Sequence, residues 1–339
     1  MSNTSNSNGT YKSSSSNEGV YVIAYYNLLM VILGTIFNAT TFFVFCRAKF
    51  RNTAARPVIH YMRAIAIIDF VGLYGWTFES YISTIYNISL TYSYTVASCK
   101  FAWFFNFWTL QASAWLHVFV SFDRYLFMSR IQPNTWFNRS KNILIIIASV
   151  ITIFVLYNFH ILLFVCYENA NGYIVTDSRL YTFLPLFQTL HLFIYDIIPS
   201  SLMLTFNFIS IYHLYKIRHI TTITNSKIRH RPITITLVVT SFLYVVTRTP
   251  SAVIYSYFYA SLQTTDWGRR LARGFNILLY TFPILNFPIY LVTFSEFRQE
   301  LFRCITRRKR QIGITDARNT QGNVMQIKLQ NMSNVRHQL

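Results

Sequence analysis

The stretch VYVIAYYNLLMVILGTIFNATTFFVFC, residues Val20–Cys46, contains no charged residue. About 20 mostly apolar residues are enough for a helix to cross the hydrocarbon core of a bilayer. The whole chain has a matching composition, because 53% of its 339 residues are hydrophobic and only 12% are charged. Soluble domains carry about 25% charged residues. The stretch therefore predicts a membrane-spanning helix, and the composition predicts a membrane protein around it.

Six further segments are long and apolar in the same way, some of them with one to three charges inside. The sequence thus predicts an all-α membrane protein, a seven-transmembrane helix bundle at residues 20–294. Prolines fall inside several segments, and in a membrane they mark kinks because neighbouring helices satisfy the freed backbone groups. The six segments are Val58–Tyr81, Phe101–Phe122, Ile143–Tyr167, Tyr181–Tyr215, Ile233–Ala260 and Gly274–Ser295.

Positive charge is concentrated in the connections on one side of the predicted spans, ending with Arg307–Arg310 after the last one. Lys and Arg are enriched on the cytoplasmic side of membrane proteins. The pattern places the N-terminus outside the cell and the C-terminus inside, with the chain in the plasma membrane. Three Asn-x-Ser/Thr triplets, at Asn3, Asn8 and Asn87, fall on the outer side and are glycan acceptors there.

The two ends of the chain are polar. Residues 1–19 lack an apolar core, which indicates that no cleavable signal peptide precedes the first span. Residues 1–19 and 311–339 are both predicted to be disordered, because polar segments bury too little apolar surface to offset the entropy of ordering.

The stretch VSFDRYLFMSR, Val120–Arg130, places Asp123, Arg124 and Tyr125 at the predicted cytoplasmic end of the third span. An acid at the membrane edge can hold a neighbouring arginine in an inward ion pair, and release frees its planar donors for a partner. The alternative is an interfacial arginine that only extends towards water. Among seven spans, this motif resembles that of rhodopsin-like (class A) G-protein-coupled receptors over residues 20–305. The resemblance implies that Asp123 neutralises Arg124 at rest and that Arg124 contacts the G protein on activation.

Polar residues inside other spans match the same family. Asp69, Ser113 and Asn286 resemble its sodium pocket, and Asn38 is the polar residue of the first span. The resemblance implies an allosteric Na⁺ beside Asp69, because an acid inside the membrane needs a partner. Protonation of Asp69 is the alternative.

The seventh span reads NFPIY and resembles the Asn-Pro-x-x-Tyr motif with its proline moved by one place. Asn286, Pro288 and Tyr290 are therefore predicted to form the G-protein coupling switch together with the Asp-Arg-Tyr triplet.

The resemblance also assigns the cysteines. Cys99 and Cys166 lie on the predicted outer side, where the family has a disulfide and where the exterior is oxidising. Cys304 follows an amphipathic run, predicted as a short eighth helix at residues 295–310, and resembles a palmitoylated cysteine. A plain free thiol is the alternative for Cys304.

Arg248 is the clearest departure from the family, because it stands where the sixth span usually carries a tryptophan. A bare guanidinium at mid-membrane costs at least ~2.5 kcal/mol, so it should face the interior and find an acid. We expect an ion pair with Asp196, with Glu79 or a ligand carboxylate as alternatives. Such a pair acts either as the activation switch or only as a static support of the fold.

The outer halves of the spans are rich in aromatic, amide and basic side chains, which suits a peptide ligand. Asn106 replaces the Asp of amine receptors and Tyr280 replaces the Schiff-base lysine of opsins, which argues against those ligands. In detail the chain loosely resembles invertebrate neuropeptide receptors. The alternative for each aromatic residue is a lipid-facing or core position. The predicted ligand-binding residues are Glu79, Trp103, Asn106, Phe107, Gln111, Gln188, His191, Asp196, Arg248 and Arg273.

The sequence therefore predicts a G-protein-coupled receptor whose partners are an extracellular peptide, a heterotrimeric G protein, arrestin or a kinase, and membrane lipid. Nucleic-acid binding is not expected, because no basic soluble domain is present. An enzyme is not expected either, since HExxH, GxSxG and P-loop motifs are absent. No cofactor is expected beyond Na⁺. The alternative functions are a seven-helix transporter, which usually shows internal repeats, and a non-signalling scavenger receptor.

Overall fold

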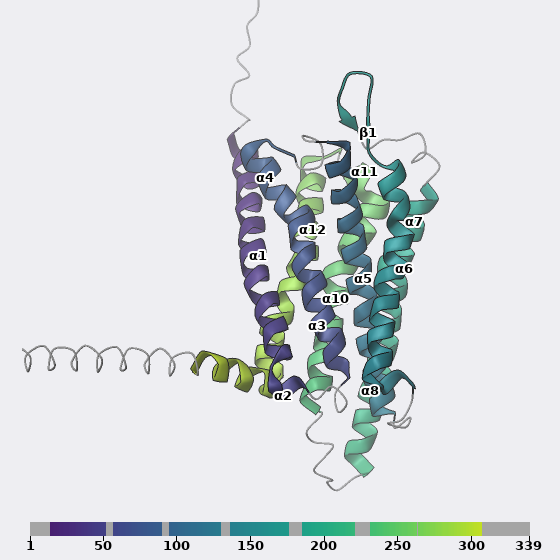
Figure 1. Ribbon diagram of the computed structural model, residues 1–339. Helices are drawn as coiled ribbons and strands as arrows, with labels where there is room; N and C mark the ends of the chain where they lie inside the picture. Colours follow the sequence, from purple (N-terminus) through teal and green to yellow (C-terminus); the bar gives the residue numbers. More distant parts are fainter. Residues whose placement is uncertain are drawn as a thin grey trace, which may run out of the picture.

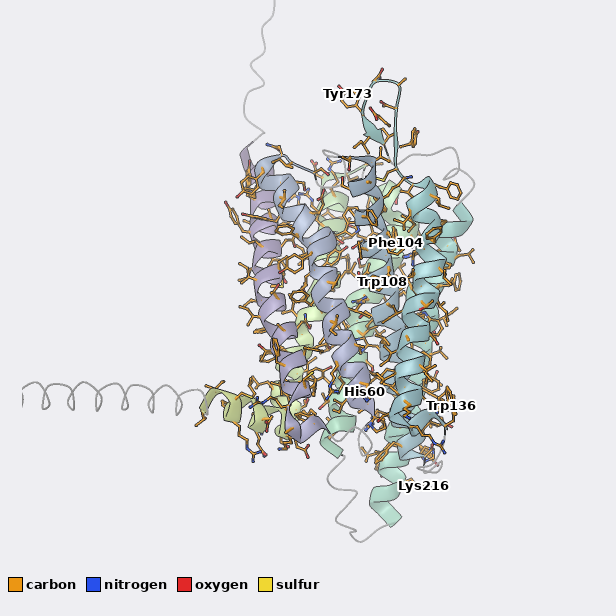
Figure 2. All side chains as sticks on the ribbon, in the orientation of Figure 1. His60, Phe104, Trp108, Trp136, Tyr173 and Lys216 are labelled. Carbon is orange, nitrogen blue, oxygen red and sulfur yellow. A yellow bond between two sulfur atoms is a disulfide. The ribbon has the colours of Figure 1, made fainter. Side chains whose placement is uncertain are left out.

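The computed structural model describes residues 14–51, 57–89, 95–129, 136–175, 185–220, 231–262 and 264–306. Within these ranges the chain is helical apart from one two-stranded hairpin and short connections. The long helices lie side by side in one bundle, with the hairpin at one end and α2 at the other (Figure 1). Tyr173 marks the hairpin end, whereas His60, Trp136 and Lys216 mark the opposite end (Figure 2).

Three π-helical turns, η1, η4 and η5, each join two consecutive helices without a loop between them. A further helix covers residues 295–306. The elements are α1 (Ser14–Cys46), α2 (Ala48–Arg51), α3 (Val58–Gly72), η1 (Leu73–Thr77), α4 (Phe78–Tyr86), α5 (Val96–Met128), η2 (Trp136–Asn138), α6 (Ser140–Phe164), β1 (Tyr167–Glu168), β2 (Ile174–Val175), α7 (Pro185–Leu192), η4 (Phe193–Ile197), α8 (Ile198–Ile220), α10 (Arg231–Val253), η5 (Ile254–Phe258), α11 (Tyr259–Leu262) and α12 (Asp266–Thr293).

Five helical segments are long and apolar enough to cross a membrane. Their outward faces carry large apolar side chains, such as Leu156, Phe208 and Val292, that are largely exposed. A continuous apolar surface of this kind is unfavourable in water but is the expected surface against lipid. The protein is therefore an all-α membrane protein. The five segments are Gly19–Cys46, Ser140–Phe164, Thr189–Lys216, Ile235–Phe258 and Asp266–Thr293.

Two more of the segments expected to span the membrane are also helical and lie in the same bundle (Figure 1). One comprises α3, η1 and α4, and it is kinked at Gly75, whose ψ of −123° is not helical. The other is α5, which is 33 residues long. A Cβ added at Gly34 of α1 would overlap the Leu73 side chain, so glycine there lets α1 approach η1 closely.

The proline at position 199 explains one of the π-helical turns. Pro199 has no backbone N–H, and its ring would collide with the carbonyl of residue 195 in a regular helix. The turn η4 lies directly before it and widens the helix there. Pro250 of α10 and Pro283 and Pro288 of α12 are each accommodated inside a helix, as expected for membrane-spanning helices.

Helix α5 is tied to its neighbours by aromatic side chains. The indole N–H of Trp108 donates to the Ile151 carbonyl of α6 at 3.4 Å, and that of Trp115 donates to the Ile194 carbonyl of η4 at 2.9 Å. Phe104 stacks parallel to Trp108 one turn away, with ring centroids 6.5 Å apart (Figure 2). These contacts fix the rotation of α5, and this rotation decides which of its polar residues face inward.

An aromatic cluster closes the end of the bundle opposite the hairpin. The ring of Tyr290 lies 5.6 Å from that of Phe45 and 5.8 Å from that of Phe297. Phe45, Phe294 and Phe297 are fully or almost fully buried, so the helix 295–306 is anchored to α1 and α12 through its first turn. This helix occupies the position predicted for the eighth helix, and residues 307–310 lie outside the described residues.

A disulfide bond joins Cys99 at the start of α5 to Cys166 next to β1, and it confirms the predicted pairing. The strands β1 and β2 pair antiparallel, with Tyr167 opposite Val175 and Glu168 opposite Ile174. The bond therefore anchors the hairpin to α5. Cys46 and Cys304 are free cysteines.

Replacing both Cys99 and Cys166 by serine is expected to lower the thermal unfolding midpoint of the purified chain. A disulfide stabilises chiefly by restricting the unfolded chain, typically by about 2–4 kcal/mol. The control is the Cys46→Ser, Cys304→Ser pair, which should leave the midpoint unchanged. An equal decrease in both double variants would contradict a specific role for the disulfide.

Candidate functional site

Three polar residues predicted to form a pocket meet inside the bundle, although they come from α3, α5 and α12. The Ser113 hydroxyl donates to Asp69 Oδ1 at 2.8 Å, and the Asn286 amide donates to Asp69 Oδ2 at 3.0 Å. All three residues are buried. We call these residues the Asp69 cluster. Asn38 does not join it, because its amide donates instead to the Pro283 carbonyl at 3.3 Å and ties α1 to α12.

The Asp69 cluster offers oxygen atoms of the kind that bind Na⁺, but the positive charge of Arg248, buried in the same helix bundle, argues against the ion. The charges of Arg248 and Asp69 attract each other. The charge that a metal ion would bring is therefore already present, and the residues do not fit the Na⁺ that the family resemblance implies.

The C-terminal end of α5 carries a buried ion pair. Arg124 donates to one carboxylate oxygen of Asp123 through Nη2 at 2.5 Å and through Nε at 3.1 Å. Both side chains are almost completely buried, and the guanidinium also lies over the Phe127 ring at 5.3 Å. Such charge-assisted bonds are stronger than neutral ones. Arg124 is thus held inside the bundle rather than extended to water.

The surroundings of this ion pair connect three helices. Tyr125 stacks on Phe206 of α8 with centroids 5.7 Å apart, and the hydroxyls of Ser121 and Ser241 of α10 lie 3.1 Å apart. Helix α10 contains no acidic residue. Within the described part of the chain, Arg124 is therefore neutralised by Asp123 alone.

Arg248 of α10 lies between two aromatic rings in the middle of the bundle. Its guanidinium carbon is 4.9 Å from the Tyr244 ring centroid and 5.2 Å from that of Phe282. It is only 1% exposed, and Nη1 donates weakly to the Tyr195 hydroxyl at 3.5 Å. Its Nε has no hydrogen-bond partner among the described residues.

The expected ion pair between Arg248 and Asp196 is not formed, since no nitrogen–oxygen distance within 4.0 Å joins these two described residues. Asp196 Oδ1 instead accepts from Thr249 at 3.2 Å and from Ser200 at 3.4 Å. These hydroxyls replace the guanidinium at the carboxylate, and the rings of Tyr244 and Phe282 hold the guanidinium away from it. The prediction was wrong on this contact.

A line of aromatic contacts runs through the hairpin half of the bundle. Trp76 of η1 meets Trp103 edge-on at 5.2 Å, and Trp103 stacks on Phe107 at 5.6 Å. Phe107 meets His191 of α7 at 4.6 Å, and His191 stacks on Tyr195 at 5.3 Å. Tyr195 in turn bonds to Arg248. We call these five residues the aromatic line.

The other predicted ligand residues are divided between the interior and the rim. Gln111 is fully buried, and its Oε1 accepts from the Asn158 amide of α6 at 2.5 Å, whereas its Nε2 has no partner among the described residues. Asn106 is buried beside Gly75. Glu79 accepts from the Ser89 hydroxyl at 2.6 Å.

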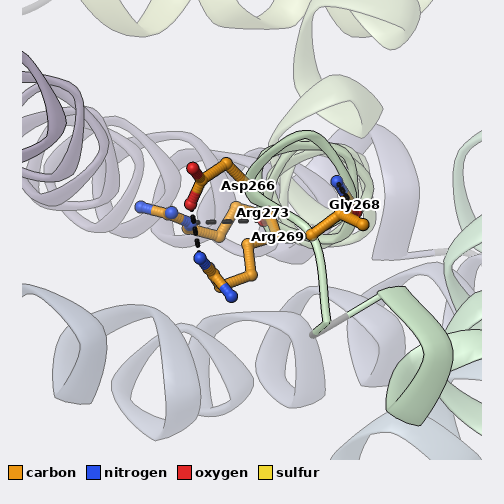
Figure 3. A network of polar contacts seen from close by, with 5 residues as sticks. Asp266, Gly268, Arg269 and Arg273 are labelled. Atoms are coloured by element: carbon orange, nitrogen blue, oxygen red, sulfur yellow. Dashed lines mark hydrogen bonds and ion pairs between the residues drawn. The ribbon is translucent and has the colours of Figure 1, made fainter.

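The rim near the start of α12 carries Arg273, whose Nε donates to the Arg269 carbonyl at 3.3 Å (Figure 3). Arg269 itself forms an ion pair with Asp266 one turn earlier. Asn87 is exposed and ends α4 in a left-handed conformation. The side chain of Gln188, together with Asn3 and Asn8, lies outside the described residues.

Several residues of the site were not predicted from the sequence. Ser200 and Thr249 satisfy Asp196, while Tyr244 and Phe282 enclose Arg248. The spacing of Asp196 and Ser200, four residues apart on one helical face, was a usable signal for the first contact. The contact of Arg248 with Tyr244 has the same four-residue spacing on α10, whereas its contact with Phe282 depends on how α10 packs on α12, for which the sequence gives no local signal.

Comparison with known proteins adds no identification. No protein-family model matches the chain, and no curated protein matches it.

Replacing Ser113 by alanine is expected to destabilise the protein more than replacing Ser210. The Ser113 hydroxyl serves a buried carboxylate, and bonds to charged groups contribute about 1.5–3 kcal/mol. Ser210 is equally buried but bonds only to the backbone carbonyl of Phe206 in its own helix. Thermal unfolding of both alanine variants in detergent measures the difference. Equal unfolding midpoints would show that the hydrogen bond of Ser113 to Asp69 stabilises the protein no more than that of Ser210 to the backbone.

Proposed function

We propose that the chain is a seven-helix receptor of the plasma membrane that transmits binding of an extracellular ligand to a cytoplasmic heterotrimeric G protein. The observation that carries this proposal is the buried Asp123–Arg124 pair at the inner end of α5. Burying an arginine in a helix bundle is costly unless it is paired, and ionisable residues within membrane-spanning helices are usually functional. The pair supplies a guanidinium that can be exposed when helices separate.

The arrangement of helices supports seven spans. Five segments meet the requirement of length and composition. The segment α3–η1–α4 and helix α5 lie among them in the same bundle (Figure 1). Their polar residues face inward, as shown by the buried Asp69, Ser113 and Gln111. Inward-facing polar groups reduce the average hydropathy of a helix without placing charge against lipid.

The orientation is supported from both ends of the bundle. The disulfide and the hairpin lie at one end, and disulfides persist in oxidising surroundings such as the cell exterior. Lys216 lies at the other end (Figure 2), as do Arg47 and Arg303, which both bond to Glu300. This distribution favours the hairpin end outside and the basic end in the cytoplasm.

The aromatic line and its neighbours support a peptide as the ligand class. Rings of Trp76, Trp103 and Phe107 offer stacking surfaces for aromatic side chains. Asp196 Oδ2 is buried and has no partner in the described structure, so it can accept a basic group of a ligand. Arg273 at the rim suits an acidic or carboxylate end.

In this proposal, the protein exists in a resting and an active arrangement of its helices, and signalling is a shift of the population from the first to the second. A ligand favours the active arrangement only if it binds that arrangement more tightly than the resting one. The ligand contacts the outer part of α5 and η4, and the response appears at the inner end of α5. Arg124 then leaves Asp123 and donates to the G protein, while the contacts of Tyr125 with α8 and of Tyr290 with α1 change.

Replacing Arg124 by alanine is expected to abolish ligand-evoked nucleotide exchange. The assay uses membranes that contain the chain, a panel of heterotrimeric G proteins and a peptide library, and it measures guanine-nucleotide exchange. Arg139→Ala is the matched control, because Arg139 is an exposed arginine beside the start of α6. Exchange that survives in Arg124→Ala would contradict the assigned role. Substrate-coupled current without exchange would favour a transporter, and peptide uptake alone would favour a scavenger receptor.

A further inference from the structure

Three charged groups are buried in the middle of the bundle, away from the Asp123–Arg124 pair. Asp69 is 3% exposed, Asp196 is 0% exposed and Arg248 is 1% exposed. None of them forms an ion pair within 4.0 Å with any described residue. A buried charge without compensation is strongly unfavourable, so the arrangement of these three groups needs a physical explanation.

Asp196 is compensated mainly by its own surroundings. Ser200, one turn further along the same continuous helix, and Thr249 both donate to its Oδ1. Arg248 is therefore not needed to hold Asp196. The second carboxylate oxygen of Asp196 is buried and has no hydrogen-bond partner among the described residues.

The Asp69 carboxylate is stabilised by the charge of Arg248 as well as by its hydrogen bonds from Ser113 and Asn286. The effect is mutual, because Asp69 is the acid that acts on Arg248. The two charges belong to one low-dielectric interior, where attraction between opposite charges extends over several ångströms.

The contacts of Arg248 place it on the outer side of the Asp69 cluster. Its guanidinium lies over Phe282, and Asn286 stands four residues further along the same helix, on the same face. Asn286 Oδ1 is a buried acceptor without a partner, and Arg248 Nε is a buried donor without one. Among the described residues, the cluster thus has a free acceptor, and the guanidinium has a free donor.

We propose that Arg248 is the resident cation of the Asp69 cluster, and that the cluster consequently binds no Na⁺. A sodium ion beside Asp69 would share the dry interior with an uncompensated guanidinium, and two like charges there repel each other. The side chain at position 248 thereby determines whether this buried acid needs a soluble ion. The proposal rests on contacts within the chain alone, so it stands or fails independently of G-protein coupling.

The test is thermal unfolding of the full chain in lipid nanodiscs at constant ionic strength, with NaCl replaced by KCl or choline chloride. The wild-type midpoint is expected to be the same in all three salts. Arg248→Gln removes the internal cation, so its midpoint should rise in Na⁺ by about 2 °C or more over K⁺. The rise should grow with Na⁺ concentration, because an ion that binds only the folded state stabilises it by mass action.

Matched variants identify the cause of any sodium effect. Arg248→Lys keeps the charge and should remain indifferent to Na⁺, and Arg273→Gln removes a rim arginine and should do the same. Adding Asp69→Asn to Arg248→Gln should abolish the sodium response. A wild-type protein that is already stabilised by Na⁺ over K⁺ would overturn the proposal, and this comparison holds even if Arg248→Gln does not fold. Absence of a sodium response in folded Arg248→Gln would overturn it as well.

Discussion

The low dielectric of the interior of a membrane-spanning helix bundle is the constraint on which the structure depends. A charged or polar group there must find its partner within the protein, because the alternative is an unsatisfied group in a low dielectric. The Asp69 carboxylate meets this requirement with one donor from α5 and one from α12, and so joins three helices at one point. The position of a single buried acid thereby fixes how α3, α5 and α12 are rotated against one another.

The same requirement gives α5 its central role. This helix forms side-chain hydrogen bonds to α6 through Trp108 and Gln111 and to η4 through Trp115. It also supplies Ser113 to the Asp69 cluster and both partners of the Asp123–Arg124 ion pair. Aromatic rings surround these groups and exclude water from them. A movement of α5 relative to its neighbours must therefore break or exchange several of these contacts together, which favours two discrete arrangements over a gradual deformation.

Residue types and their depth in the spans were sufficient to predict part of this structure. The disulfide between Cys99 and Cys166 and the meeting of Asp69 with Ser113 and Asn286 followed from residues that match a known pattern. The partner of Arg248 could not be predicted in the same way. The Asp196 carboxylate accepts from the hydroxyls of Ser200 and Thr249 instead, and the choice among these donors depends on side-chain geometry. The contact of Gln111 with Asn158 could not be predicted either, because it is set by the rotation of α5 and not by the depth of Gln111 in the membrane.

The Asp123–Arg124 pair offers the most direct measurement, because it requires no knowledge of the ligand. Since α10 supplies no second acid, removal of the Asp123 charge leaves Arg124 without a neutralising partner. The measurement is ligand-free nucleotide exchange by G proteins in membranes that contain Asp123→Asn, compared with wild type and with Asp123→Asn, Arg124→Ala at equal expression. The account predicts faster basal exchange in the single variant and its loss in the double variant. Equal basal exchange in all three, from chains that fold and insert, would contradict the claim that this ion pair holds the protein at rest.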